Sequence, residues 1–162
     1  MPFVFQNFDG LTWALMGAAL AVGLAGIGSA MGVAIAGKAA TGVLSEKPDL
    51  FGKVLVLQAL PGTQGIYGFL MAVLMLVSMG WLDGAPKALT EAEGQMYFAA
   101  ALPIALVGLV SGIYQGKIAA SSILMTGKRP EISTRGITMT ALVETYAILA
   151  LLVSILMWTA LP

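Results

Sequence analysis

The sequence predicts an all-α membrane protein whose four transmembrane helices form two tandem repeated hairpins. Three observations predict it: 59% of the 162 residues are hydrophobic and only 10% are charged, four long apolar segments follow one another, and the second half resembles the first. A soluble domain usually carries about 25% charged residues, so this chain has too few for a water-facing surface. We therefore expect a single membrane domain over residues 1–162.

Four segments are each long enough to cross a hydrocarbon core about 30 Å thick. They cover residues 11–37, 54–80, 96–125 and 136–161. Residues 1–10 contain no Lys or Arg, so they lack the basic start of a cleaved signal peptide. The first segment is therefore expected to remain as a membrane helix.

Three short polar segments separate the spans, and their basic residues are unevenly distributed. In chain order they hold three, one and three Lys or Arg residues. Cytoplasmic loops carry an excess of Lys and Arg. We therefore expect a multi-pass protein of the cell membrane, with connections one and three in the cytoplasm and both termini outside.

Charge and composition exclude several classes of function. The net charge is zero, so no basic field exists to attract nucleic acid. The chain has no Cys and no His, which removes disulfides, thiol nucleophiles and the usual soft metal ligands.

An internal repeat relates residues 11–80 to residues 96–161. The glycines within 28–32 align with those within 112–116 and, after a loop that we take to be two residues shorter, the rest aligns without a gap. The chain therefore consists of two fused helical hairpins. Only the second has a carboxylate in the middle of a span, that of Glu144.

Small residues recur every four positions in the first and third spans. This spacing keeps them on one helical face, where two backbones can approach closely. Such a stripe fits either a tightly wound inner ring of helices from neighbouring copies or ordinary packing in a monomeric bundle. Its presence in both repeats favours a closed homo-oligomeric ring. The residues are Gly28, Gly32, Ala36 and Ala40, then Gly108, Gly112, Gly116 and Ala120.

Glu144 is the clearest candidate for a functional residue, and Gly62 occupies the matching place in the first repeat. A charged side chain in the middle of a span is costly and rarely accidental. Desolvation disfavours its ionised form. Glu144 must therefore be protonated, paired or metal-bound, and a purely structural glutamate satisfied by hydroxyls is the weaker alternative.

Other polar residues lie at a similar depth. Gln115 lies about as far before the third connection as Glu144 lies after it, so antiparallel helices bring the two to the same height. Thr63 and Gln64 lie at the corresponding height of the second span. Tyr67 follows Gln64 by three positions, on nearly the same helical face.

Pro61 lies directly before these residues and has no amide hydrogen, so the carbonyl of Leu57 loses its helical partner. The resulting bend can turn oxygens toward a ligand. The combined set of a carboxylate, two amide oxygens and two hydroxyls suits a hard cation, whereas a proton needs only the carboxylate. This favours Na⁺ as cargo, with H⁺ on a hydrogen-bonded Glu144 as the alternative.

Two further polar residues stay outside this assignment. Lys117 lies within the third span, where it can extend toward the cytoplasmic interface or face a wet ring interior. Tyr146 can either donate a hydrogen bond to Glu144 or simply pack.

Three segments closely resemble the duplicated proteolipid of bacterial V/A-type ATPases, the rotor-ring K subunit, which is similar to eukaryotic vacuolar proteolipids. They are residues 60–68, 111–117 and 142–147, in this order and in the matching repeats. The resemblance extends over nearly the whole chain, residues 11–157, and is strongest to the Na⁺-translocating members.

The resemblance implies a set of Na⁺ ligands and a role in a complex. It implies a closed ring of identical copies in membrane lipid, which turns against a stator subunit and is joined to a central-stalk subunit. The ring protein itself is not an enzyme, since nucleotide hydrolysis belongs to other subunits. The Tyr67 position secures the carboxylate by a hydrogen bond. The implied ligands are the Leu60 main-chain carbonyl, Thr63, Gln64, Gln115 and Glu144.

A small multidrug-exporter-like secondary transporter is the main rival, because such proteins also use a lone membrane glutamate and oligomerise. An exporter should surround that glutamate with an aromatic-lined cavity, and alternating access then comes from related repeats. Here aromatic residues make up only 8% of the chain, and amides and hydroxyls accompany the glutamate. A purely structural four-helix protein leaves the buried carboxylate unexplained.

Overall fold

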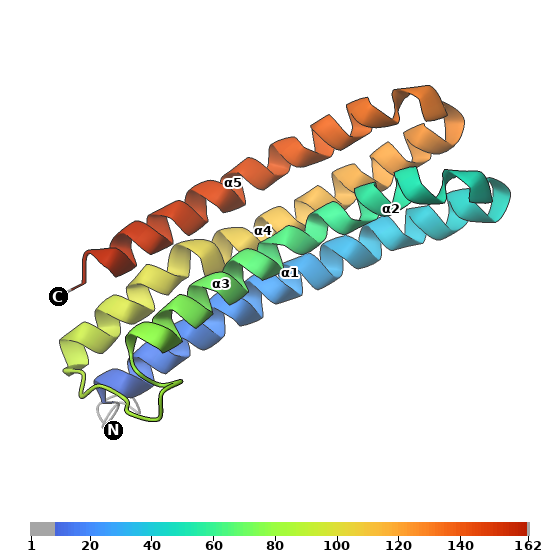
Figure 1. The fold of residues 1–162 in the computed structure, drawn as a ribbon. Coiled ribbons are helices and arrows are strands. Elements are labelled where there is room, and N and C mark those ends of the chain that lie inside the picture. The colour runs from blue at the N-terminus through green and yellow to red at the C-terminus, as the bar shows by residue number, and fades with distance from the viewer. Residues whose placement is uncertain (1–8, 162) are drawn as a thin grey trace, which may run out of the picture.

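The computed structural model describes residues 9–161, which form two long helical hairpins packed side by side (Figure 1). Four helical segments in this part of the chain are long and apolar enough to span a membrane, and it contains no strand. The predicted all-α class with four transmembrane helices is confirmed. In chain order the elements are α1 (Gly10–Glu46), η1 (Pro48–Leu50), α2 (Phe51–Ala59), η2 (Leu60–Gly62), α3 (Thr63–Ser78), α4 (Glu91–Lys128), η3 (Pro130–Ile132) and α5 (Ser133–Thr159).

The helices extend beyond the predicted spans. Helix α1 continues to Glu46 instead of ending near Gly37, and α4 continues to Lys128. The first and third polar segments are therefore largely helical, with Lys47 and Arg129 as their non-helical residues. Hydropathy marks where the apolar segment ends, whereas a hydrogen-bonded helix can continue into water as long as its backbone groups remain paired.

The two hairpins have connections of equal length, so the predicted two-residue shortening of the second loop is wrong. The interval from Glu46 to Lys128 is 82 residues (128 − 46), and the interval from Pro48 to Pro130 is the same. Small residues occupy nearly every second position of this part of α1, so glycines can be aligned in two registers that differ by two residues. The backbone selects the register in which Ala30 corresponds to Gly112.

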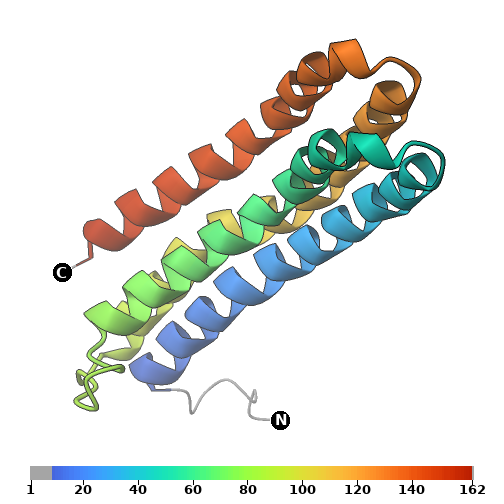
Figure 2. The same cartoon turned by 45° about the vertical axis from the view of Figure 1, so that its right-hand side comes forward.

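The first and third connections lie together at one end of the molecule, as Figure 2 shows. Lys47 Nζ donates a hydrogen bond to the carbonyl of Gly127 at 2.6 Å, and Lys53 Nζ donates one to the carbonyl of Pro130 at 3.1 Å. The start of α1, the connection between α3 and α4, and the end of α5 lie at the opposite end. This arrangement places the first and third connections on one side of a membrane.

Helices α1 and α4 form the central pair, and their stripes of small residues face each other. A Cβ atom added to Gly32 would lie 2.2 Å from the carbonyl oxygen of Gly112, and one added to Gly116 would lie 2.4 Å from the Cα atom of Gly32. Any larger side chain would push the two backbones apart. The stripes predicted to bring helices together thus meet within one chain.

The outer helices flank this pair, with α2 and α3 against α1 and α5 against α4 (Figure 1). Two apolar clusters form the core, one containing Met71, Met75 and Ile104 and the other containing Leu57 and Ile123. Much of the outer surface is also apolar, as expected where lipid replaces water. Its exposed side chains include Ile66, Phe69, Leu142, Leu149 and Leu156.

Candidate ion-binding site

The second span is interrupted where the proline predicts it. The short 3-10 turn η2, with Pro61 buried in it, separates α2 from α3. The Thr63 hydroxyl donates to the Leu60 carbonyl at 2.9 Å. The amide of Gly65, near the start of α3, donates to Ser29 Oγ of α1 at 2.7 Å. A side chain of a neighbouring helix therefore supports the distorted segment.

Two buried glutamines lie between the outer and central helices. Both Gln64 of α3 and Gln115 of α4 are 0% exposed, and Gln64 Nε2 donates to Gln115 Oε1. Gln115 Nε2 in turn donates to the carbonyl of Thr140 on α5 at 3.2 Å. Gln64 Oε1 is left buried without a hydrogen-bond partner among the described residues. Leaving such a group unpaired costs about 1–3 kcal/mol, so this oxygen is a natural ligand for a cation.

The carboxylate lies on the other outer helix. Glu144 is located near the middle of α5, is partly buried, and accepts a hydrogen bond from the Tyr67 hydroxyl of α3. The described residues contain no group of three or more His, Cys, Asp or Glu side chains that could hold a metal ion together. Every other oxygen named in this site is neutral, so one formal negative charge is available, which matches a monovalent cation or a proton.

The structure brings some of the predicted residues into contact and leaves others apart. It joins Gln64 to Gln115 and Tyr67 to Glu144, whereas Leu60 and Thr63 bond to each other through their carbonyl and hydroxyl groups. Among the described residues, Leu60 and Thr63 form no hydrogen bond with the carboxylate.

Two residues of this network were not found from the sequence. Thr140 precedes Glu144 by four residues, so helical spacing already places both on one face. No sequence signal points to Ser29. Its role is to accept a hydrogen bond from the Gly65 amide, which lies across the interface between α1 and α3.

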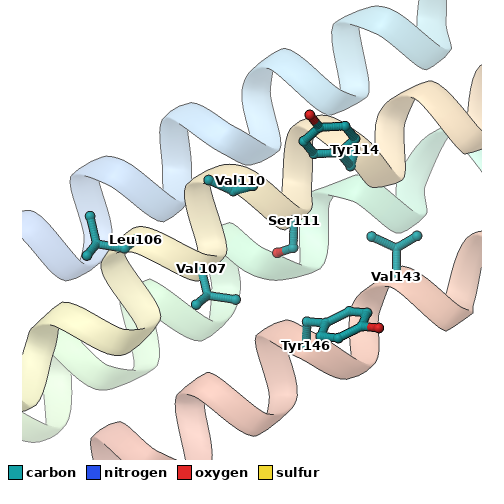
Figure 3. A pocket seen from close by; sticks show the side chains of 7 residues that line it. All are labelled: Leu106, Val107, Val110, Ser111, Tyr114, Val143 and Tyr146. Carbon is teal, nitrogen blue, oxygen red and sulfur yellow. The ribbon is translucent and has the colours of Figure 1, made fainter.

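Lys117 and Tyr146 lie on exposed surfaces. Lys117 is exposed, and its Nζ lies 4.5 Å from the ring centroid of Tyr114, a cation–π contact. Tyr146 is 65% exposed and lines an apolar groove between α4 and α5 (Figure 3). Neither has a recorded hydrogen bond to Glu144.

Comparison with known families gives two matches within the chain. The profile of the ATP synthase C-subunit family matches residues 16–75 and again residues 98–157. This chain belongs to the ATP synthase C-subunit family. Its two matches begin 82 residues apart (98 − 16), the same interval that separates the ends of α1 and α4.

The chain is similar over nearly its whole length to subunits of ion-translocating ATPases. It is 42% identical to the V-type sodium ATPase subunit K of Enterococcus hirae, with 97% of each chain covered. It is 40% identical to the A-type ATP synthase subunit K of Methanocaldococcus jannaschii, covering 95% of this chain and 66% of that protein. It is 29% identical to the 16 kDa proteolipid of the V-type proton ATPase of Nephrops norvegicus, covering 90% and 89%.

Proposed function

We propose that this chain is the rotor-ring subunit of a V/A-type ATPase membrane sector, and that it carries one Na⁺ per copy at Glu144. Membership of the ATP synthase C-subunit family and 42% identity to a V-type sodium ATPase subunit K support the rotor assignment. They also set this chain apart from the exporter-like transporters that share a lone membrane glutamate.

The unpaired oxygen of Gln64 is the observation that favours a metal ion. If a proton alone occupies Glu144, Gln64 Oε1 stays buried without a partner and its desolvation goes uncompensated. A Na⁺ ion between the two glutamines and the carboxylate gives this oxygen a positive partner. The same cation neutralises Glu144, whose Tyr67 hydrogen bond holds the carboxylate toward α3.

The proposed ligands come from three helices, so ion binding depends on how the hairpins pack. The neutral oxygens are hard ligands of the kind that alkali and alkaline-earth cations prefer. Pro61 positions the segment that carries three of the proposed ligands by interrupting the helix. The proposed set is the Leu60 carbonyl, Thr63, Gln64, Gln115 and Glu144.

Rotation follows from the cost of a charge in lipid. An empty, ionised Glu144 facing hydrocarbon costs several kcal/mol, whereas a neutralised site can travel around the rim of a ring. Unloading then needs a polar, positively charged surface, which we assign to a stator subunit. A central-stalk subunit would couple the ring to nucleotide hydrolysis elsewhere in the complex, so the chain itself is not an enzyme.

One carboxylate serves four helices, because Gly62 stands at the position of Glu144 in the first hairpin. Fewer ions per turn give each ion a larger share of the energy of hydrolysis, which suits a pump that works against a steep gradient. The excess of Lys and Arg in connections one and three supports a cytoplasmic position for that end of the molecule.

Carbodiimide labelling of Glu144 tests the cargo, because the reagent attacks a protonated carboxyl. Purified protein is labelled at several pH values in Na⁺ or in equal K⁺, with Glu144→Gln as the unlabelled control. We expect Na⁺ but not K⁺ to protect, most strongly at higher pH, where fewer protons compete. Labelling that follows pH but ignores Na⁺ would identify H⁺ as the cargo.

A further inference from the structure

Helix α5 carries the carboxylate, and its main neighbour among the described elements is α4 (Figure 2). The contacts that fix α5 on α4 therefore decide where Glu144 lies. A buried hydroxyl cluster forms one such contact, on the side of the ion site toward the first and third connections. It consists of Ser122 of α4 and Thr140 of α5, which are 4% and 0% exposed, together with the carbonyl of Gly136.

Hydrogen bonds join all three members of this cluster. The Thr140 hydroxyl donates to the Gly136 carbonyl at 2.8 Å and also points to Ser122 Oγ at 3.3 Å, while the Ser122 hydroxyl donates to the same carbonyl at 3.2 Å. Gly136 permits this close approach, because a Cβ atom added there would lie 2.9 Å from Ser122 Cβ. The cluster thus connects the two helices through groups that water does not reach.

Thr140 connects this cluster to the ion site. Its main-chain carbonyl accepts a hydrogen bond from Gln115 Nε2 at 3.2 Å, and Gln115 Oε1 accepts one from Gln64. A carbonyl can only accept, so it selects the nitrogen end of the Gln115 amide. Turning that amide over would set two oxygens against each other. Thr140 thereby directs an oxygen, and not a nitrogen, of Gln115 toward Gln64, as a cation ligand requires.

The same residue also affects the direction of the carboxylate. Glu144 follows Thr140 by four residues, so the two lie on nearly the same face of α5. Thr140 is buried against α4, whereas Glu144 is partly buried and accepts a hydrogen bond from Tyr67. A rotation of α5 that moves the Thr140 hydroxyl off Ser122 would therefore also turn Glu144 relative to Tyr67.

The hairpin architecture itself does not require hydroxyls at this level. The interval of 82 residues between the hairpins makes Ala40, Val54 and Gln58 the counterparts of Ser122, Gly136 and Thr140. Ala40 and Val54 are buried in the apolar cluster that contains Leu57. The hairpin without a mid-span carboxylate thus uses apolar packing where the hairpin with Glu144 uses hydroxyls.

We propose that Ser122 and Thr140 are positioning residues of the ion site, which fix α5 on α4 so that the Gln115 oxygen and the Glu144 carboxylate face one ion. The proposal rests on the proposed function, because it concerns the same site. Neither hydroxyl is itself a ligand. Removing one should therefore weaken ion binding while every ligand stays present.

Thr140→Val tests this role, because it keeps the branched shape of the side chain and removes only the hydroxyl. The readout is the Na⁺ concentration that half-protects Glu144 from carbodiimide, in membranes containing the full chain. We expect this concentration to rise about fivefold, the effect of losing one hydrogen bond. Thr140→Ser keeps the hydroxyl and should restore a concentration close to that of the unsubstituted chain. Ser122→Ala removes the other hydroxyl and should also raise the concentration.

Thr126→Val is the matched control. Thr126 is also 0% exposed, but its hydroxyl donates to the Ser122 carbonyl at 2.9 Å within α4 itself. The substitution makes the same chemical change at the same burial and leaves the contact between helices in place. Ser154→Ala is the second control, because Ser154 Oγ accepts the Ile104 amide across α4 and α5 at 3.2 Å, ten residues beyond Glu144. We expect both controls to lower thermal stability and neither to change the Na⁺ concentration.

Unchanged Na⁺ protection in Thr140→Val would overturn the proposal, and so would an equal rise in either control. If Thr140→Val does not assemble, Ser122→Ala takes its place in the same comparison. Failure of Na⁺ to protect the unsubstituted chain would instead contradict the proposed function. The rate of carbodiimide labelling at one pH then becomes the readout, and equal rates in Thr140→Val and Thr126→Val would overturn the positioning role.

Discussion

The two hairpins differ most where their outer helices cross the middle of the molecule. In the first, the 3-10 turn at Leu60–Gly62 separates α2 from α3, whereas in the second α5 runs from Ser133 to Thr159 as one helix. Gly62 of the first hairpin carries no charge, whereas Glu144, at the equivalent position of the second hairpin, carries a carboxylate. One hairpin thus contributes neutral oxygens on an interrupted backbone, and the other contributes the charge on a regular helix.

Two serines at equivalent positions of the hairpins show how this backbone difference changes the hydrogen bonding. Ser29 Oγ accepts the Gly65 amide, which is available because the helix is distorted after Pro61. Ser111, at the same place in the second hairpin, has no such partner, since Val143 replaces the proline and α5 is uninterrupted. Divergence of the two halves after duplication can therefore divide one ion site between two hairpins that share a backbone plan.

Removing the charge should have the largest effect. Glu144→Gln keeps the side-chain size but removes the negative charge, and losing one partner of a buried charge pair costs about 3 kcal/mol or more. We expect Na⁺ affinity to fall by a factor of at least about 100, measured by binding of radioactive Na⁺ to the purified protein. Glu131→Gln, in the exposed turn η3, serves as the control and should leave the affinity unchanged. Equal losses of affinity in the two variants would mean that the Glu144 carboxylate is not what binds Na⁺.

Removing the Tyr67 hydroxyl, which links the two hairpins, should have the next largest effect on Na⁺ binding. Tyr67→Phe removes the hydrogen bond to Glu144, and hydrogen bonds to charged groups contribute about 1.5–3 kcal/mol. We expect Na⁺ affinity to fall about tenfold, measured by the Na⁺ concentration that gives half-maximal protection from carbodiimide. Tyr146→Phe removes a hydroxyl from the exposed tyrosine of the other hairpin and should leave this concentration unchanged. A similar loss of Na⁺ affinity in both variants would contradict the role of the Tyr67 hydroxyl in holding the carboxylate.

The paired serines test the backbone difference directly. Ser29→Ala leaves the Gly65 amide without its partner and should lower stability by about 1–3 kcal/mol. Ser111→Ala removes no hydrogen bond among residues 9–161 and should have a smaller effect. Thermal unfolding of the two variants in detergent compares them, and equal losses would show that the two hairpins are supported alike at this level.

The smallest expected effect concerns the starts of the central helices. Hydrogen bonds from Thr12 hold the pKa of the exposed Asp9, the N-cap of α1, below its ordinary value of 3.8. A carboxylate with a lowered pKa stabilises the helix above that ordinary value, and the benefit is lost as pH falls through the folded pKa. Below about pH 4, the protection factor of the Thr12 amide against hydrogen exchange should therefore fall.

Asp9→Asn keeps a capping acceptor that does not titrate, so the protection factor of the Thr12 amide should depend less on pH. Helix α4 starts instead with the Thr90 hydroxyl, paired with Glu93 in a capping box. An identical acid response in Asp9→Asn would show that the cap is not responsible.

The amino-acid sequence by itself determined the four spans, the duplication, the depth of the carboxylate and the bend at Pro61. These features depend on local chemistry: apolar length, a missing amide hydrogen, and one charge that hydrocarbon does not tolerate. The family resemblance implied Tyr67 as the partner of Glu144, and the structure contains this hydrogen bond.

The tertiary structure alone decided the register between the repeats and showed that their connecting loops are equally long. It also brought the two small-residue stripes together within one chain. It also decided that Ser29 and Thr140 join the network and that Gln64 Oε1 stays unpaired. The physical reason is that small residues tolerate several registers equally well. Only the packing of whole helices against one another selects one register and fixes which polar groups find partners.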